Sequence, residues 1–239
     1  MDRTLVWVLL CTLISNSAYA LIAPFLPIEY AEKGIKEESV GLIFAIYSVA
    51  VIFVSPLVGK SVNTVGSTNL ITIGTCVMGI CFILFGLVDD MESTEAIFYY
   101  SLVLRLIQGS SSSFVQVTCY SIATNDFPEI KDKIVGWLEA LTGLGLIMGP
   151  LIGSVLYTAV GFKHAFFIYG AFLVMLSIVI KINFPNQNIT DDTDYVDMTS
   201  AAEVDEQVMD TQSYQRLTNQ EVLNYSADFN DDVYRTQPR

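Results

Sequence analysis

An arginine and a glutamine stand inside a long apolar stretch of this 239-residue chain. Arg105 begins the string RLIQGSSSS at 105–113, and Gln108 follows three residues later. Residues at this spacing share one helix face, and an ionised side chain in a bilayer costs several kcal/mol unless it is paired or hydrated. We therefore expect both residues to line the interior of a helix bundle. The alternative is that Arg105 only ties helices together through a backbone carbonyl.

Glu139 is the acidic residue that we place most clearly within an apolar segment. It lies six residues before Gly145. A carboxylate in a low-dielectric setting can bind and release protons near neutral pH, which makes Glu139 a candidate proton-coupling residue. It could equally be hydrated by lipid headgroups at the cytoplasmic end of its helix. Asp126, at the end of another apolar segment, is expected to be a surface or gate residue.

Three polar residues, Ser15, Asn16 and Ser17, stand in the middle of the first apolar segment. Pro24 and Pro27 interrupt its outer end, and such a helix can bend and face a cavity. Ser15 and Asn16 are therefore candidates for a substrate cavity. The alternative is that they only form hydrogen bonds to a neighbouring helix, as polar residues in membranes often do.

The run GLGLIMGPLIG at 143–153 carries a stripe of glycines. Gly145, Gly149 and Gly153 recur every four residues, so they share one helix face on which another helix can pack closely. Gly143 and Pro150 belong to the same run, and a proline inside a helix removes one backbone hydrogen bond and favours a bend. The run predicts either a moving hinge or a static helix contact.

The composition indicates a membrane protein. The chain is 52% hydrophobic and 15% charged, with a mean hydropathy of +0.50, which is unusual for a soluble domain. Residues 185–239 hold 12 acidic and 3 basic residues, which is −9 of the net charge of −13. We expect no nucleic-acid binding from so acidic a chain. Because the sequence shows no phosphate loop, nucleophile elbow or metal-ligand spacing, we expect neither an enzyme nor a cofactor or metal site.

Six apolar segments are long enough to cross a bilayer, which takes about 20 helical residues. They cover 5–27, 40–60, 69–88, 96–124, 134–160 and 165–184. The predicted fold is an all-α membrane domain at 1–184, followed by an acidic, largely disordered tail at 185–239. Two blocks of three helices enter the membrane from opposite sides, which predicts two inverted three-helix repeats.

Basic residues near the helix ends favour one orientation. With the amino terminus in the cytosol, the inner side holds Arg3, Lys60, Lys131, Lys133 and Lys181, and the outer side holds Lys33, Lys36 and Lys163. This bias places the amino terminus and the tail in the cytosol. The first segment also resembles a cleavable secretory signal peptide, but its apolar run resumes after the possible cut, so we favour a membrane span.

Two tyrosine-based patterns lie in the predicted tail, YVDM at 195–198 and YQRL at 214–217. Both resemble cytosolic sorting signals of vesicular and endosomal proteins. Either four-residue pattern can also arise by chance.

Three strings resemble motifs of the major facilitator superfamily of transporters. RLIQG at 105–109 is similar to its fourth-helix motif, and GLGLIMGPLIG at 143–153 is similar to its fifth-helix antiporter motif. GKSVNTVGST at 59–68 resembles the loop motif between helices two and three, with Gly59 and Gly66 in matching positions.

The charges of that loop motif differ from those of the family. Asn63 stands where the family has an aspartate, and Thr64, Ser67 and Thr68 stand where it has basic residues. A cytoplasmic latch that depends on these charges is therefore not expected in this chain.

Within the superfamily, APFLPIEYAEKGI, VGLIFAIYSV, CFILFG and GWLEALTGLGLIMGP most resemble vesicular amine transporters, in particular their polyamine branch. The resemblance implies exchange of protons for an organic cation, across a vesicular or endolysosomal membrane. It implies that Arg105 and Gln108 serve proton coupling and gating, that 145–153 is the antiport hinge, and that Glu139 is a cation or proton site. Ser15 stands where monoamine carriers have an aspartate, which makes a monoamine substrate less expected.

The family fold has twelve helices in two halves with the substrate between them, and this chain matches one half. We therefore expect a half or truncated transporter whose alternating access needs a second half, from a second copy, a partner chain or a longer native chain. The rival interpretation is a membrane protein that does not transport and uses the half as a binding or regulatory subunit.

Overall fold

Helices make up the architecture of residues 3–184, the part of the chain that the computed structural model describes. They are α1 (Arg3–Leu21), α2 (Leu26–Glu32), α3 (Glu37–Val65), α4 (Ser67–Gly86), α5 (Thr94–Asn125) and α6 (Lys131–Asn183), with short 3₁₀ helices η1 (Leu87–Asp90) and η2 (Pro128–Ile130). The predicted tail and its YVDM and YQRL patterns lie outside the described residues.

The connections differ in length from those expected. The first apolar segment forms two helices, because α1 ends at Leu21 and α2 begins at Leu26 with Pro27 in its first turn. The loop motif at 59–68 lies mostly within α3 and α4, which are separated by Gly66 alone. Gly66 has a φ of 87°, a left-handed conformation that glycine adopts without strain.

Helix α6 consists of two helical parts joined at one residue. Gly161 has φ 80° and ψ 174°, which breaks the helix into parts at 131–160 and 162–183. Pro150 lies inside the first part, and the departure from helical geometry within α6 falls at Gly161 and not at this proline.

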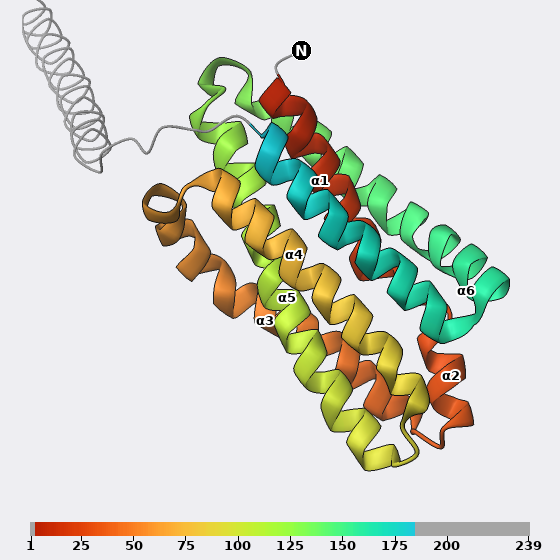
Figure 1. The fold of residues 1–239 in the computed structure, drawn as a ribbon. Coiled ribbons are helices and arrows are strands. Elements are labelled where there is room, and N and C mark those ends of the chain that lie inside the picture. The colour runs from red at the N-terminus through yellow and green to blue at the C-terminus, as the bar shows by residue number, and fades with distance from the viewer. Residues whose placement is uncertain (1–2, 185–239) are drawn as a thin grey trace, which may run out of the picture. The chain divides into compact units, whose positions relative to one another are not determined.

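The glycine stripe of the 131–160 part packs against α1 (Figure 1). A methyl group on Gly145, Gly149 or Gly153 would meet a backbone carbonyl oxygen of α1 at 2.7 Å or less, at Leu13, Ser17 and Leu21 respectively. Contacts that advance along both helices together show that α1 and the 131–160 part run parallel. Gly143 has no atom within 4 Å of the same position, so it does not belong to this contact.

Other helix pairs also meet at glycines. Helix α5 lies beside α3 (Figure 1), where Gly109 faces the Tyr47 backbone and the Ser113 hydroxyl donates to the Val51 carbonyl oxygen at 3.3 Å. Gly79 of α4 and Gly170 of α6 face each other, because a methyl group on either would lie within 2.8 Å of the carbonyl oxygen of the other. Small residues at such points allow the backbones to approach closely.

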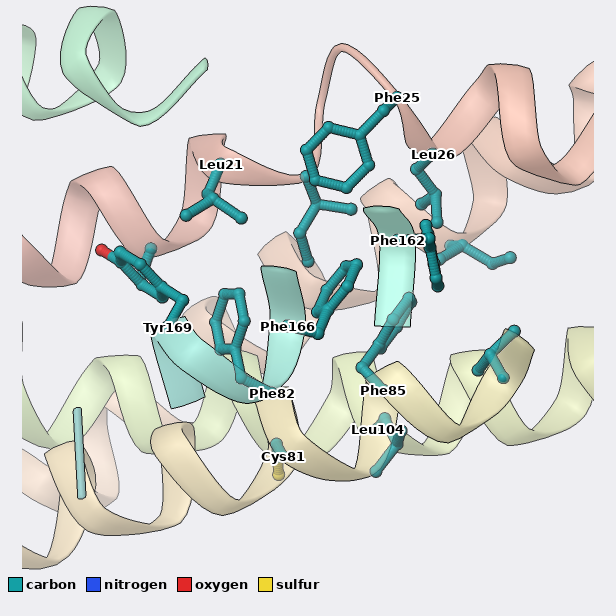
Figure 2. Packing of buried hydrophobic residues seen from close by; sticks show 14 of the residues in the cluster. Leu21, Phe25, Leu26, Cys81, Phe82, Phe85, Leu104, Phe162, Phe166 and Tyr169 are labelled. Atoms are coloured by element: carbon teal, nitrogen blue, oxygen red, sulfur yellow. The ribbon is translucent and has the colours of Figure 1, made fainter. Parts of the chain in front are cut away.

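An aromatic core joins α4, the 162–183 part of α6 and the connection after α1 (Figure 2). Phe166 stacks on Phe85 with ring centroids 5.1 Å apart, and Phe162 lies 4.7 Å from Phe166. Phe25 meets Phe166 edge to face at 5.8 Å. Such ring pairs add specific contacts to the burial of apolar area, and they hold this end of the bundle together.

Polar contacts tie the two ends of the bundle. At one end, Lys33 pairs with Asp89 at 3.7 Å and Lys163 pairs with Asp90 at 2.5 Å. At the other, Lys181 donates to the Asn69 side chain at 2.5 Å. Lys33 and Lys163, both predicted to lie outside, are thus at one end of the bundle, and Lys181 is at the other.

Four helical stretches of the described chain are long and apolar enough to cross a membrane. They are Arg3–Glu32, Glu37–Val65, Ser67–Asp90 and Pro128–Asn183. Helix α5 is also long, but Arg105, Gln108 and its serine run lower its hydropathy. The all-helical membrane architecture agrees with the prediction, and the division into six spans stays a prediction.

We expect Gly149→Ala to lower the free energy of unfolding by about 1–3 kcal/mol, because the added methyl group forces α1 away from α6. The matched control is Gly143→Ala, which adds the same group where there is open space. Denaturant-induced unfolding of both variants in detergent micelles measures the difference. Equal stability of the two variants would contradict this description of the stripe.

Candidate functional site

Arg105 is held by aromatic rings in the interior of the bundle. It is 0% exposed, and its guanidinium carbon lies 5.0 Å from the centroid of the Phe44 ring and 5.8 Å from those of Tyr47 and Phe85. Rings at these distances attract a cation through their electron-rich faces. Helices α3, α4 and α5 therefore share the contacts of this one charge.

The hydrogen bonding of Arg105 is incomplete. Its Nη1 donates to Gln108 Oε1 at 3.4 Å, while its Nε and Nη2, like the Gln108 amide nitrogen, have no hydrogen-bond partner in the described residues. The ion pairs within residues 3–184 join other groups, at Lys33 and Lys163. A buried arginine without a carboxylate partner contributes little to stability, so a purely structural role for Arg105 is poorly supported.

Ser15 belongs to a polar contact between α1 and α5. The hydroxyls of Ser15 and Ser112 are 3.3 Å apart, and Gln116 donates to Ser112 at 2.9 Å. Ser112 is fully buried. The spacing of these residues is a clue to such a contact, because Gln108, Ser112 and Gln116 recur every four residues and so share a helix face.

Helix α6 receives hydrogen bonds from Asn16 of α1 and from Tyr120 of α5, the latter at Glu139. Asn16 Nδ2 donates to the Thr12 carbonyl oxygen at 2.8 Å and to Thr142 Oγ1 at 3.3 Å. Glu139 is exposed on the surface of the helix bundle, where its Oε1 accepts a hydrogen bond from the Tyr120 hydroxyl at 2.6 Å. Sequence reasoning did not single out Thr142 or Tyr120.

The glycine stripe and the polar residues of α1 lie together. A methyl group on Gly145 would approach the Asn16 Cβ at 2.9 Å. The helix face that carries Asn16 is therefore the face against which the predicted hinge packs, although Gly143 lies off this contact.

The loop-motif residues lie apart from Arg105, toward the ends of their helices. Gly59 is exposed within α3, Asn63 is half-buried one turn later, and Gly66 forms the turn to α4. Asp126 is the capping residue at the end of α5, where its backbone N–H donates to the Ile122 carbonyl oxygen. Partial desolvation raises the pKa of the Asp126 carboxyl.

Comparisons with a family profile and with individual proteins identify the same family. The sequence profile of the Major Facilitator Superfamily matches residues 8–194. The human MFS-type transporter SLC18B1 is 27% identical over 172 residues, covering 72% of this chain and 38% of the human protein. The multidrug resistance protein MdtG of Proteus mirabilis is 26% identical over 182 residues, covering 74% of this chain and 43% of that protein.

A further relative is the quinolone resistance protein NorA of Staphylococcus aureus. It is 26% identical over 173 residues, which cover 71% of this chain and 42% of NorA. The chain thus spans less than half the length of the curated relatives that it matches.

We expect Arg105→Met to leave the free energy of unfolding unchanged or to raise it by about 1–4 kcal/mol, because an apolar side chain replaces a buried charge without an acidic partner. Leu104→Met, a buried neighbour, is the control and should change stability by less than about 1.5 kcal/mol. Unfolding of the purified chain in detergent measures both variants. A large loss of stability in Arg105→Met alone would assign Arg105 a structural role.

Proposed function

The chain belongs to the major facilitator superfamily, and from this premise we propose that it is one half of a proton-coupled antiporter for a small organic cation such as a polyamine. The observation that carries the proposal is the buried Arg105, which has no carboxylate partner in residues 3–184. A charge kept at such a position in a membrane protein is typical of proton and substrate pathways. The human relative is named a transporter, which supports the same class of function.

Six membrane spans are part of this proposal. Helix α5 and the two parts of α6 would each cross the membrane, in addition to α1, α3 and α4. The directions of the helices support this, because α1 is parallel to the 131–160 part, as α5 is to α3. In an inverted repeat the first span corresponds to the fourth and the second to the fifth. The pair formed by the first and fifth spans is then equivalent to the pair formed by the fourth and second spans.

One contact and the positions of two helix reversals also support an inverted repeat. Gly79 and Gly170, on the third and sixth proposed spans, contact each other reciprocally, as residues near a two-fold axis do. The reversals at Gly66 and Gly161 occupy equivalent places, between the second and third spans and between the fifth and sixth, and both glycines have positive φ.

Transport by alternating access needs a second half, and the proposed partners are therefore the lipid bilayer, protons, the cation and that half. In this proposal Arg105 and Gln108 serve proton coupling and gating, and Glu139 is a cation or proton site. Ser15 and Asn16 line the cavity. The stripe from Gly145 to Gly153 lets α6 move against α1, since it presents no side chains to that helix.

The test is uptake of spermidine by vesicles that contain the reconstituted chain and have an acidic lumen. We expect uptake to stop when the proton gradient is dissipated, and Arg105→Ala to reduce it at least tenfold, because coupling loses its fixed charge. Val103→Ala, at an exposed position of α5, is the matched control and should retain uptake. Uptake that persists in Arg105→Ala would refute the assigned role, and its absence in a verified dimer would favour a regulatory subunit.

The proposed orientation places the amino terminus and the region after 184 in the cytosol, in a vesicular or endolysosomal membrane. Asn188 and Asn224 begin glycosylation acceptor sequences outside the described residues. We expect neither to carry a glycan in cells, because glycosylation acts on the lumenal side. A shift in electrophoretic mobility on glycosidase treatment, lost in Asn188→Gln or Asn224→Gln, would reverse the orientation.

A further inference from the structure

We propose that Tyr120 and Thr142 are positioning residues for Glu139, and that with Asn16 they build a subsite for an ammonium group that carries N–H donors. The proposal rests on the proposed transport of an organic cation and names the residues that would hold it. It starts from side chains on α1, α5 and α6 that form one continuous polar chain.

The chain of contacts begins on α1 and ends on α6. Asn16 Nδ2 donates to Thr142 Oγ1 at 3.3 Å, and Thr142 lies within hydrogen-bonding reach of the Tyr120 hydroxyl. The Tyr120 hydroxyl in turn donates to Glu139 Oε1 at 2.6 Å. Thr142 and Glu139 are three residues apart and share a face of α6, so Tyr120 reaches both from α5.

The direction of donation is the same at every step. An amide N–H of Asn16 occupies a lone pair of Thr142, and the hydrogen of Tyr120 is given to Glu139, which leaves the Thr142 hydroxyl to donate to the Tyr120 oxygen. Hydrogen bonds aligned in this way polarise one another. All of these dipoles therefore point their positive ends toward the carboxylate and fix its orientation.

The carboxylate held in this way has room for a cation. Within residues 3–184 no lysine, arginine or histidine pairs with Glu139, and its side chain is exposed on the bundle surface. An ionised carboxylate is costly where it faces lipid tails, and a bound cation in a polar cavity would remove that cost, as hydration by lipid headgroups would at the end of a span. Its remaining lone pairs accept hydrogen bonds, which favours a primary or secondary ammonium group over a quaternary one.

The same contacts connect the subsite to the packing of α1. Asn16 donates to Thr142 and also lies against Gly145, which belongs to the close contact between α1 and α6. A cation bound to Glu139 would change the hydrogen bonds between Asn16 and Glu139, because Tyr120 and Thr142 connect these two residues. Occupancy of the subsite is thereby sensed at the helix pair that we propose as the hinge.

Protection of Glu139 from a carboxyl reagent tests the subsite directly. The purified 239-residue chain in lipid nanodiscs is treated with dicyclohexylcarbodiimide at constant pH, and loss of the unmodified peptide that contains Glu139 is measured by mass spectrometry, so that coupling of a spermidine amine to the activated carboxyl counts as modification and not as protection. We expect spermidine to reduce the modification several-fold. Tetraethylammonium at the same concentration should give no protection, because it has no N–H donor.

The positioning residues are tested by the spermidine concentration that gives half-maximal protection. We expect it to rise about tenfold in Tyr120→Phe, which corresponds to about 1.4 kcal/mol, because the carboxylate loses its orienting donor. Thr142→Val should raise it less, and Thr142→Ser, which restores the hydroxyl, should return it to the original value. Tyr100→Phe, which removes a hydroxyl bonded to the Leu84 carbonyl oxygen elsewhere in the bundle, should leave it unchanged.

Each result decides one question. Protection that is equal in the unchanged chain, Tyr120→Phe and Thr142→Val would overturn the positioning roles, and the Thr142→Ser rescue excludes general misfolding as the cause of a loss. Lack of protection in the unchanged chain would overturn the subsite even if vesicles take up spermidine. Protection without any uptake by a verified dimer would keep the subsite and remove the proposed transport function.

Discussion

Close approach of helix backbones at glycines is the constraint on which the arrangement of this bundle depends. In a bilayer, lipid tails are as apolar as leucine, so helices gain little by hiding apolar side chains and associate through tight packing and polar contacts. Gly145, Gly149 and Gly153 bring α6 onto α1, Gly109 brings α5 onto α3, and Gly79 meets Gly170. These contacts decide which helices are neighbours and therefore which polar side chains can reach each other.

The polar interior follows from that arrangement. Because α1 and α5 are adjacent, Ser15 meets Ser112, and because α1 and α6 are adjacent, Asn16 meets Thr142. Arg105 is buried where α3, α4 and α5 converge, with three aromatic rings in place of a carboxylate. The charge, the hydrogen-bonded residues and the glycine contacts thus belong to one continuous region of the membrane domain.

The helical architecture and the glycine stripe were predictable from the sequence, because hydropathy and residue spacing are local patterns. Hydropathy gave the helical membrane architecture, and four-residue spacing identified the glycine stripe. The partners of the polar residues were not accessible, since contacts such as Tyr120 with Glu139 depend on how distant helices pack. The break after Leu21 and the helical continuation of the loop motif up to Gly66 were also missed, because short connections leave little trace in hydropathy.

The reversals at Gly66 and Gly161 have a mechanical consequence. Gly66 alone joins α3 to α4, and Gly161 alone joins the two parts of α6. The joined ends of each helix pair therefore cannot slide past one another. Helices α1 and α5 are connected through longer segments that contain α2, η1 and η2. Motion of α3 relative to α4, or of one part of α6 relative to the other, must therefore pivot at these glycines, while α1 and α5, which carry Asn16 and Arg105, are held by packing against α6 and α3.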